Sequence, residues 1–558
     1  MKLNNYFGDY KKSNVEQLLE YISILETYVK KYYNFGKPFF RGKHKLIYKD
    51  YLKNCNLNYE SMTPQETFKY ISPLYQNIPN WNNPGTMINV IPPVNIVSMA
   101  SVSLSGLYNP NFAQDTYAGL LITAELEVVK YISDLIGWDW TKSHGVFTFG
   151  GKGTSLYATK ISLNKSNSDV GKKGCERGKY FMITSSTAHP CHYQVCDWLG
   201  IGSDNCIEAP CDEAGKIIVE EAKKIACENI EKGKIFLGFN VNGGSTNELT
   251  VDPIKDIYET NLEIIKKYNL KYSPHIHADS VLGWISLFFN KYDFKNNPLK
   301  IQNKHLSKIK SLNKKVQEIK YADSIGVDFH KTGFCPYVSS VFIVKNRKDY
   351  FKLSPEKEIS LEDLHYGNFN PYDTTLELTR SSMGAIAALS CLKSLGIKGF
   401  QKIIGNIYSS TEYFREKLST NKNVCIINKD TEGFATLFIL KPKKYTKIFL
   451  KEILELPEKD IDYIRNYNIN YGKFILEKSK NSEITFTYTS SRSYVIPGTS
   501  IKIGALKAYP MSVFLNHKEI KRIVNEIFLS IDEYANSKGV GNFSEKEIIS
   551  DDMVYKKR

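Results

Sequence analysis

The feature that most constrains the fold is an alternation of helix-like and strand-like segments between about residues 111 and 400. Helical patterns occupy 118–137, 153–163 and 252–268, and short β-rich runs occupy 179–186, 234–242, 274–284 and 337–345. Helices that alternate with short strands typically build a parallel sheet that is covered by helices. We therefore expect an α/β domain with a mainly parallel sheet in this region.

The sequence on either side of this region has a different pattern. Residues 1–80 carry helical patterns rich in tyrosine and lysine, and an apolar segment follows them to about residue 107. After residue 400 the helical patterns at 400–419 and 517–534 are longer, with β-rich runs at 423–428 and 435–441. A chain of 558 residues is too long for one core. We predict a helical N-terminal segment at 1–110, a large α/β domain at 111–400 and a small α+β domain at 401–558.

Composition excludes several classes of protein. With 42% hydrophobic and 13% aromatic residues, the chain is not intrinsically disordered. The most apolar stretch, 87–107, is interrupted by Pro92, Pro93 and Asn95, so we expect no membrane span. The N-terminus lacks the apolar core of a signal peptide, and we expect a cytoplasmic protein.

The net charge of +15 is explained by surface lysines. Lysines are spread along the chain, and the densest run, 300–320, places apolar residues at helical spacing. This pattern predicts an amphipathic helix with a solvated basic face. We therefore expect no nucleic-acid partner.

Two sets of residues could suggest a metal, and we favour neither. Two C-x4-C pairs are formed by Cys191, Cys196, Cys206 and Cys211. Zinc ligands usually lie closer together in a small module, so we expect buried free thiols. On a strand, His275, His277 and Asp279 would share one face at about 7 Å spacing, which is too wide for easy joint ligation.

A glycine-rich turn opens the predicted helix at 153–163. Gly150, Gly151 and Gly153 would let backbone N–H groups approach an anion at the helix N-terminus, with Lys152 and Thr154 as further donors. The turn is not a Walker A loop, because Gly153 follows Lys152 where that motif requires Ser or Thr. Taken alone, the segment is equally typical of an ordinary turn.

Three more polar residues follow predicted strands, where open α/β sheets collect ligand-binding groups. Asp279 lies among apolar neighbours, and a buried carboxylate needs a cation such as a protonated pyridine nitrogen, although a hydrogen-bonded structural Asp is an alternative. Lys331 follows His330 at the end of an apolar run, a setting in which a lysine can form a Schiff base. His189, taken alone, is typical of a satisfied loop residue.

Together, the order glycine turn, His, Asp and Lys resembles the group II pyridoxal-phosphate-dependent amino-acid decarboxylases. The resemblance covers about residues 80–400 and rests mainly on the D-x-H-K run at 328–331 and the H-x-D run at 277–279. It implies fold type I, with a mainly parallel seven-stranded sheet flanked by helices and a small C-terminal α+β domain. It also implies pyridoxal 5'-phosphate as cofactor, and a homodimer with active sites at the subunit interface.

The resemblance assigns roles residue by residue. Lys331 would hold the cofactor as a Schiff base, Asp279 would pair with its pyridinium nitrogen, and His189 would stack on its ring. The residues expected to contact the cofactor are Gly151, Lys152, Thr154, His189, Thr246, Asp279, Val281, His330 and Lys331.

Three features depart from the family pattern. Lys152 stands where the family usually has Ser or Thr, and Val281 replaces a smaller residue. Residues 288–318 have the character of an insertion between Asp279 and Lys331.

The activity that the resemblance implies is decarboxylation of an L-amino acid to its amine and CO2. After CO2 leaves, a proton must reach Cα, and the family uses a loop tyrosine; we prefer Tyr366 to Tyr372. One alternative is a Cα–Cβ lyase similar to the sphingosine-phosphate lyases, which share the H-K-x-G-x-x-P run found at 330–336. Another is a non-catalytic binding protein with this fold. The segment 91–95 should border the pocket, but it selects neither an acidic nor an aromatic substrate.

Overall fold

The large domain is built on one seven-stranded sheet. The computed structural model describes residues 2–42, 46–354, 359–480, 487–491 and 494–537. The strands are β2 (His144–Thr148), β3 (Tyr180–Ser185), β4 (Cys206–Ala209), β5 (Ile235–Asn242), β6 (His275–Asp279), β7 (Ser324–Asp328) and β8 (Ser340–Val344), in the order β2-β8-β7-β6-β5-β3-β4. β8 pairs antiparallel with β2 and β7, and the other four pairings are parallel. The predicted mainly parallel sheet is therefore confirmed.

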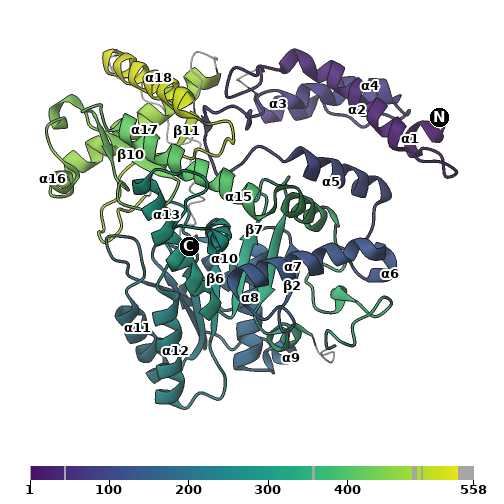
Figure 1. Ribbon diagram of the computed structural model, residues 1–558, viewed down its shortest axis with the longest axis horizontal. Coiled ribbons are helices and arrows are strands. Elements are labelled where there is room, and N and C mark those ends of the chain that lie inside the picture. The colour runs from purple at the N-terminus through teal and green to yellow at the C-terminus, as the bar shows by residue number, and fades with distance from the viewer. Residues whose placement is uncertain (1, 43–45, 355–358, 481–486, 492–493, 538–558) are drawn as a thin grey trace.

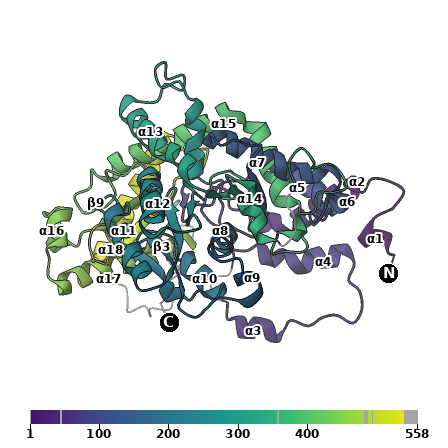
Figure 2. The ribbon, with the colours of Figure 1, turned by 90° about the horizontal axis from the view of Figure 1, so that it is seen from below.

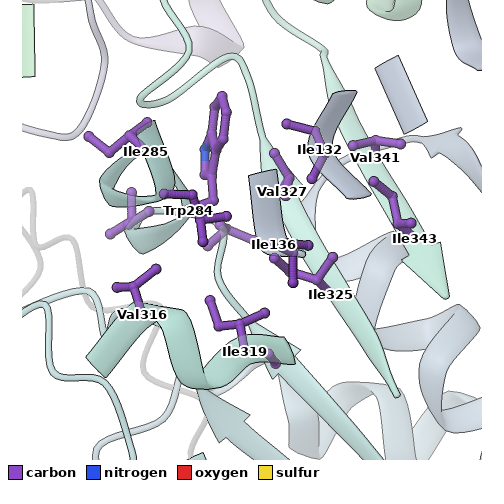
Figure 3. Close-up of a cluster of buried hydrophobic side chains, with 14 of the residues drawn as sticks. Ile132, Ile136, Trp284, Ile285, Val316, Ile319, Ile325, Val327, Val341 and Ile343 are labelled. Atoms are coloured by element: carbon purple, nitrogen blue, oxygen red, sulfur yellow. The ribbon is translucent and has the colours of Figure 1, made fainter. Parts of the chain in front are cut away.

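Alternation along the central strands separates a packing face from a site face. Ile325 and Val327 of β7 point toward α7 (Thr123–Ile136) and toward Trp284 of the 3-10 helix η5 (Gly283–Lys291), as Figure 3 shows. Gly326 faces α8 (Gly151–Ser166), where a Cβ atom would lie 2.3 Å from Oγ1 of Thr154. Glycine at this position lets α8 approach the sheet closely. The last residue of β7 consequently points to the α8 side.

Further helices complete the large domain. They are α6 (Asp115–Ala118), α9 (Val170–Lys173), α10 (Cys191–Trp198), α11 (Val219–Glu231), α12 (Ile254–Tyr268), α13 (Asn303–Val316) and α14 (Arg347–Tyr350). Figure 1 shows α11 and α12 together beside the sheet. The apolar stripe of α12 is buried, which explains why its pattern was readable from the sequence.

The C-terminal region forms a second sheet, as predicted. Its strands are β1 (Thr86–Met87), β9 (Val424–Ile426), β10 (Thr436–Leu440), β11 (Thr487–Ser491) and β12 (Ala505–Ala508), in the order β1-β11-β12-β10-β9. The helices α16 (Leu450–Leu454), α17 (Glu458–Lys480) and α18 (His517–Asn536) accompany it in one lobe (Figure 1). Strand β1 pairs with β11, so the N-terminal segment supplies one strand of this sheet. The predicted domain limits at 110 and 400 stay predictions, and residue 558 lies outside the described residues.

The N-terminal helices are α1 (Asn4–Phe7), α2 (Val15–Val29), α3 (Tyr48–Lys53), α4 (Pro64–Ile71) and α5 (Ile96–Tyr108). Helices α1 to α4 lie at one corner of the molecule, away from the lobe of α16 to α18 (Figure 1). Helix α5 instead lies with α7 and α15 (Met383–Leu418), as Figure 2 shows. The helical N-terminal segment is thus an arm, and its last helix packs on the large domain.

Among the described residues, helix α15 alone has the length and apolar composition to cross a membrane. Gly396 interrupts it with a positive φ of 58°, so α15 is two helices joined at a kink. Its first half buries Ala385, Ala387 and Cys391, and the hydroxyl of Ser98 in α5 donates to the Ala387 carbonyl at 3.0 Å. We interpret α15 as an interior helix.

The predicted insertion at 288–318 contributes the basic helix α13. Its apolar face is buried as predicted, but its lysines are not simply solvated. Lys308 lies 2.9 Å from Glu412 of α15, and Lys315 lies 2.5 Å from Glu432. The insertion is therefore joined by ion pairs to the start of the C-terminal region.

A buried ion pair connects the two ends of the large domain. Arg380 and Glu125 are 7% and 1% exposed, and the guanidinium contacts both carboxylate oxygens. Glu125 also accepts from the backbone N–H of Phe147 at 2.7 Å, and Arg380 donates to the Phe147 carbonyl at 3.2 Å. The pair thus anchors strand β2 just before the glycine turn.

We predict that Glu125→Gln destabilises the protein by about 3–5 kcal/mol, because it leaves the buried Arg380 guanidinium without its counter-ion. Asp134→Asn is a matched control on the same helix, since it breaks the exposed Lys130–Asp134 pair at 2.7 Å and should cost less than about 1 kcal/mol. Denaturant unfolding of both variants measures the difference. Equal losses of stability in the two variants would contradict this role.

Candidate active site

The predicted site residues converge at one edge of the sheet. Asp279 ends β6, and Lys331 follows the end of the neighbouring β7 by three residues. His189 follows β3, and Gly151 follows β2. Because these strands are parallel to one another, their carboxyl ends meet at the same edge, where open α/β sheets bind ligands. The sequence order therefore becomes a spatial cluster.

Asp279 is a buried carboxylate, and one of its two oxygens is unpaired within the described part of the chain. Its Oδ2 lies 3.5 Å from Nε2 of His192, and its Oδ1 has no hydrogen-bond partner among the residues that the structure describes. Burial alone would raise the pKa of the Asp279 carboxyl, but the hydrogen bond from His192 and the electrostatic effect of the surrounding imidazoles hold it well below its ordinary value. Asp279 is therefore an anion at neutral pH, with one oxygen available to a cationic donor.

His192 is held in place by Asn240 of β5. The Asn240 amide nitrogen lies 3.1 Å from Nδ1 of His192, and both residues are buried. When this amide donates to Nδ1, the remaining proton sits on Nε2 and points at Asp279. This arrangement stabilises the carboxylate without neutralising it.

His189 presents an accessible ring at the site. Its Nδ1 accepts the backbone N–H of Cys191 at 3.1 Å, which fixes the orientation of the ring. The surrounding protein and the nearby Lys331 lower the pKa of His189 to about 4, so the imidazole is neutral at physiological pH. A neutral, exposed ring is suited to stacking on a flat ligand.

Lys331 forms an ion pair with Asp328. Its Nζ lies 2.9 Å from Oδ2 of Asp328, whose side chain is 1% exposed, while the lysine side chain is 27% exposed. Burial alone would lower the pKa of Lys331, but Asp328 raises it above its ordinary value. His330 contacts the same carboxylate, with Nε2 at 3.5 Å from Oδ2. The Lys331 amine is thus reachable from the site and charged.

The glycine turn borders this ion pair. A Cβ atom on Gly151 would lie 2.9 Å from Oδ2 of Asp328 and 3.1 Å from Cγ1 of Val281, so the turn and both side chains are in contact. Gly151 is the first residue of α8, and the N-terminus of that helix favours an anion. Val281 therefore lies beside the predicted phosphate end of the site.

Lys152 and Thr154 have other contacts in this structure. The Lys152 ammonium lies 4.8 Å from the centroid of the Trp198 ring, a cation–π contact. Thr154 is buried, and its hydroxyl donates to the Gly151 carbonyl at 2.7 Å, so it supports the turn from within. Their predicted contacts with a cofactor stay predictions.

Thr246 and the two candidate tyrosines lie on loops. Thr246 follows β5, and its carbonyl accepts from Tyr509 at 3.4 Å. Tyr366 is 60% exposed, and the segment after it is tied down because Gly367 and Phe369 both donate to Asp115. Tyr372 is half-buried, in the 3-10 helix η8 (Pro371–Asp373). The choice between the tyrosines stays a prediction.

Sequence reasoning missed three residues of this cluster. His192 stands three positions after His189 on the following helix, a spacing that could have drawn attention to it. Asp328 belongs to the D-x-H-K run but received no role. Tyr337 packs on His330 with ring centroids 4.2 Å apart. No periodic signal in the sequence marks that contact.

The structure groups the candidate metal ligands differently from the sequence pattern. His275 and His277 both contact the Ser324 hydroxyl, at 2.7 and 2.8 Å. Within the described ranges, the ligand atoms that converge belong to Cys191, His192 and Asp279, all within 4.8 Å of one another. Burial raises the pKa of the Cys191 thiol, so the thiol is neutral in the metal-free protein.

The cluster fits pyridoxal phosphate group by group. The unpaired Oδ1 of Asp279 can accept from a pyridinium nitrogen, the His189 ring can cover the face of the pyridine, and Lys331 supplies an amine for the aldehyde. Gly151 is the first residue of α8, and the N-terminus of that helix favours an anion such as a phosphate. We infer from these features that the site matches this cofactor better than a metal.

Comparison with known proteins agrees with this inference. Residues 69–295 match the family model described as the pyridoxal-dependent decarboxylase conserved domain. The acidic amino acid decarboxylase GADL1 of Xenopus tropicalis is 22% identical over 326 residues, or 58% of each chain. The chain thus matches 58% of the length of this curated relative.

Solved structures share the fold. The crystal structure of mouse CSAD has a TM-score of 0.74 at 14% identity, over 92% of this chain and 99% of that one. Oryza sativa TDC, solved with PLP and tryptamine, has a TM-score of 0.73 at 12% identity, over 94% and 98% of the two chains. The fold is therefore fold type I of the pyridoxal-phosphate enzymes, as predicted.

Residues 69–295 are similar to the pyridoxal-dependent decarboxylase conserved domain, and the predicted family resemblance is confirmed. The family match ends at residue 295, before Lys331. The assignment of that lysine therefore rests on its place after β7, beside Asp279.

We predict that pyridoxal phosphate added to the protein gives a yellow complex, and that borohydride then fixes the cofactor on Lys331. Lys331→Arg should lose the fixed label, because it keeps a cation beside Asp328 but removes the amine nucleophile. Lys152→Arg is the matched control and should keep the label on Lys331. Peptide mapping that finds the label on a different lysine would make this assignment wrong.

Proposed function

We propose that this protein is a pyridoxal-phosphate-dependent decarboxylase that converts an L-amino acid to its amine and CO2. The observation that carries the proposal is the unpaired carboxylate oxygen of Asp279 in the same cluster as Lys331, on a chain of which residues 69–295 match a pyridoxal-dependent decarboxylase domain. The bound cofactor supplies an electron sink for the bond that breaks at Cα. Asp279 strengthens that sink by holding a proton on the ring nitrogen.

The other residues position and protect this chemistry. Lys331 attaches the cofactor, and His189 covers one face of its ring. Gly151 and His330 lie at the phosphate end, and Tyr366 is proposed to return a proton to Cα after CO2 has left. Decarboxylation at Cα is favoured over Cα–Cβ cleavage, because the domain match and the named relatives are decarboxylases.

We further propose a cytoplasmic homodimer with active sites at the interface. A groove of about 1250 Å³ is lined by segments 93–96 and 513–517 and by α15, and it carries exposed apolar side chains. Ile96 is 78% exposed and Phe514 is 59% exposed. Phe334, three residues after Lys331, also lines the groove. All ten cysteines are free thiols, which is typical of proteins from a reducing compartment.

The test is a screen of amino acids for amine product by mass spectrometry. It includes acidic and aromatic substrates, since the similar proteins include an acidic amino acid decarboxylase and Catharanthus roseus tryptophan decarboxylase. We expect one class of amino acid to give amine and CO2 in equal amounts, and Lys331→Arg to give neither. An aldehyde and glycine formed without CO2 would identify the Cα–Cβ lyase instead.

We predict that Asp279→Asn lowers kcat by more than about tenfold, because an amide cannot keep the ring nitrogen protonated as a carboxylate does. The substitution is isosteric and retains a group beside His192, so the midpoint of thermal unfolding should change little. Activity assays with saturating cofactor measure the first effect. A smaller loss of kcat would show that Asp279 is not the partner of the ring.

We predict that Tyr366→Phe slows amine formation and raises the share of aldehyde product. The variant keeps the ring but lacks the hydroxyl that returns the proton to Cα. A larger share of turnovers should therefore end with protonation at the cofactor and release of aldehyde. Tyr372→Phe is the matched control and should leave the amine-to-aldehyde ratio unchanged. If Tyr372→Phe changes the ratio and Tyr366→Phe does not, the loop has been misassigned.

A further inference from the structure

Asp328 is a second buried carboxylate at the site, and both of its oxygens contact polar groups. Its side chain is 1% exposed, yet Oδ2 lies 2.9 Å from the Lys331 ammonium. Its Oδ1 accepts from the Ser340 hydroxyl of the neighbouring strand β8 at 2.5 Å. These two contacts fix the position of the buried carboxylate.

The position of Asp328 follows from the sheet. Alternation along β7 directs Ile325 and Val327 into the core and leaves Asp328 on the face of α8, beside Gly151. Lys331 is three residues later, on the turn that leaves the strand, so its side chain can fold back onto the carboxylate. The ion pair is therefore built into the local geometry.

We propose that Asp328 is a catalytic residue for covalent attachment of the cofactor: it holds Lys331 as an ammonium in the cofactor-free protein and accepts the proton that Lys331 must lose. The inference rests on the proposed role of Lys331 as the attachment residue. It assigns Asp328 a chemical task at the reacting nitrogen, which its Oδ2 contacts directly.

The protons balance in this step. The ammonium gives one proton to Asp328, and the neutral amine nitrogen bonds to the aldehyde carbon. The nitrogen passes one proton to the former carbonyl oxygen, and Asp328 returns its proton to the same oxygen, which leaves as water. The products are a protonated C=N group and one water molecule, and Asp328 ends as a carboxylate.

Other titratable groups also face this pair, from each element packed around it. They are Asp279 of β6, His189 after β3, Cys191 of α10, and His330 and Tyr337 beside Lys331. Among them, Asp279 is directed at His192 rather than at the lysine. Asp328 is thus the carboxylate in direct contact with Nζ.

The test measures the reactivity of Lys331 in the full-length, cofactor-free protein. Limiting acetic anhydride acetylates neutral amines, and mass spectrometry gives the rate for the Lys331 peptide relative to the exposed Lys172. We expect Asp328→Asn to speed acetylation of Lys331 at pH 8 by about tenfold, as loss of a contacting anion predicts. Asp323→Asn, at the opposite end of β7, is the matched control and should change nothing.

A second measurement uses the natural sequence. Its result therefore does not depend on whether Asp328→Asn folds. The pH profile of Lys331 acetylation in the natural sequence should have its midpoint above about 10.4, the ordinary value for lysine. A midpoint below that value, or a rate in folded Asp328→Asn within about twofold of the natural protein, would overturn the proposal. Neither result depends on decarboxylation, so failure here is distinguishable from failure of the proposed function.

Discussion

The site depends on the burial of two carboxylates on one face of adjacent parallel strands. Asp279 and Asp328 each end a strand whose other face is packed into the core, so neither carboxylate can turn away to solvent. Each has a cationic or protonated partner: His192 for Asp279, and Lys331 for Asp328. Because a buried carboxylate without a partner costs several kcal/mol, the sheet imposes this charge arrangement before any ligand binds.

The two pairs differ, and the difference predicts how the cofactor is oriented in the site. One oxygen of Asp279 has no hydrogen-bond partner among the described residues, which suits a cationic ring nitrogen at that end. Asp328 is closed by Lys331 and Ser340 and lies by the glycine turn. The covalent bond and the phosphate thus belong at the β7 and α8 end, and the ring nitrogen belongs at the β6 end. The buried Arg380–Glu125 pair holds the strand that leads into the glycine turn.

Much of this arrangement was predictable from the sequence, for a definite reason. Asp279, His189 and Lys331 follow short apolar runs bounded by polar residues, and parallel topology brings such strand ends together. The interactions between side chains were less readable. His192 acts through a helix that packs on the sheet, and the pairing of Thr86 with Thr487 joins residues too distant in sequence for any local pattern. The ion pairs of α13 with Glu412 and Glu432 likewise depend on tertiary packing, although its apolar face was evident.

The most direct test of this account is the protonation state of the cofactor's ring nitrogen in the reconstituted protein. Nuclear magnetic resonance of pyridoxal phosphate labelled with nitrogen-15 in the ring reports that state without reference to activity. The buried Asp279 anion predicts a protonated nitrogen at neutral pH, and a deprotonated one in Asp279→Asn. A nitrogen that is unprotonated in the natural protein, or a signal that Asp279→Asn leaves unchanged, would contradict the account.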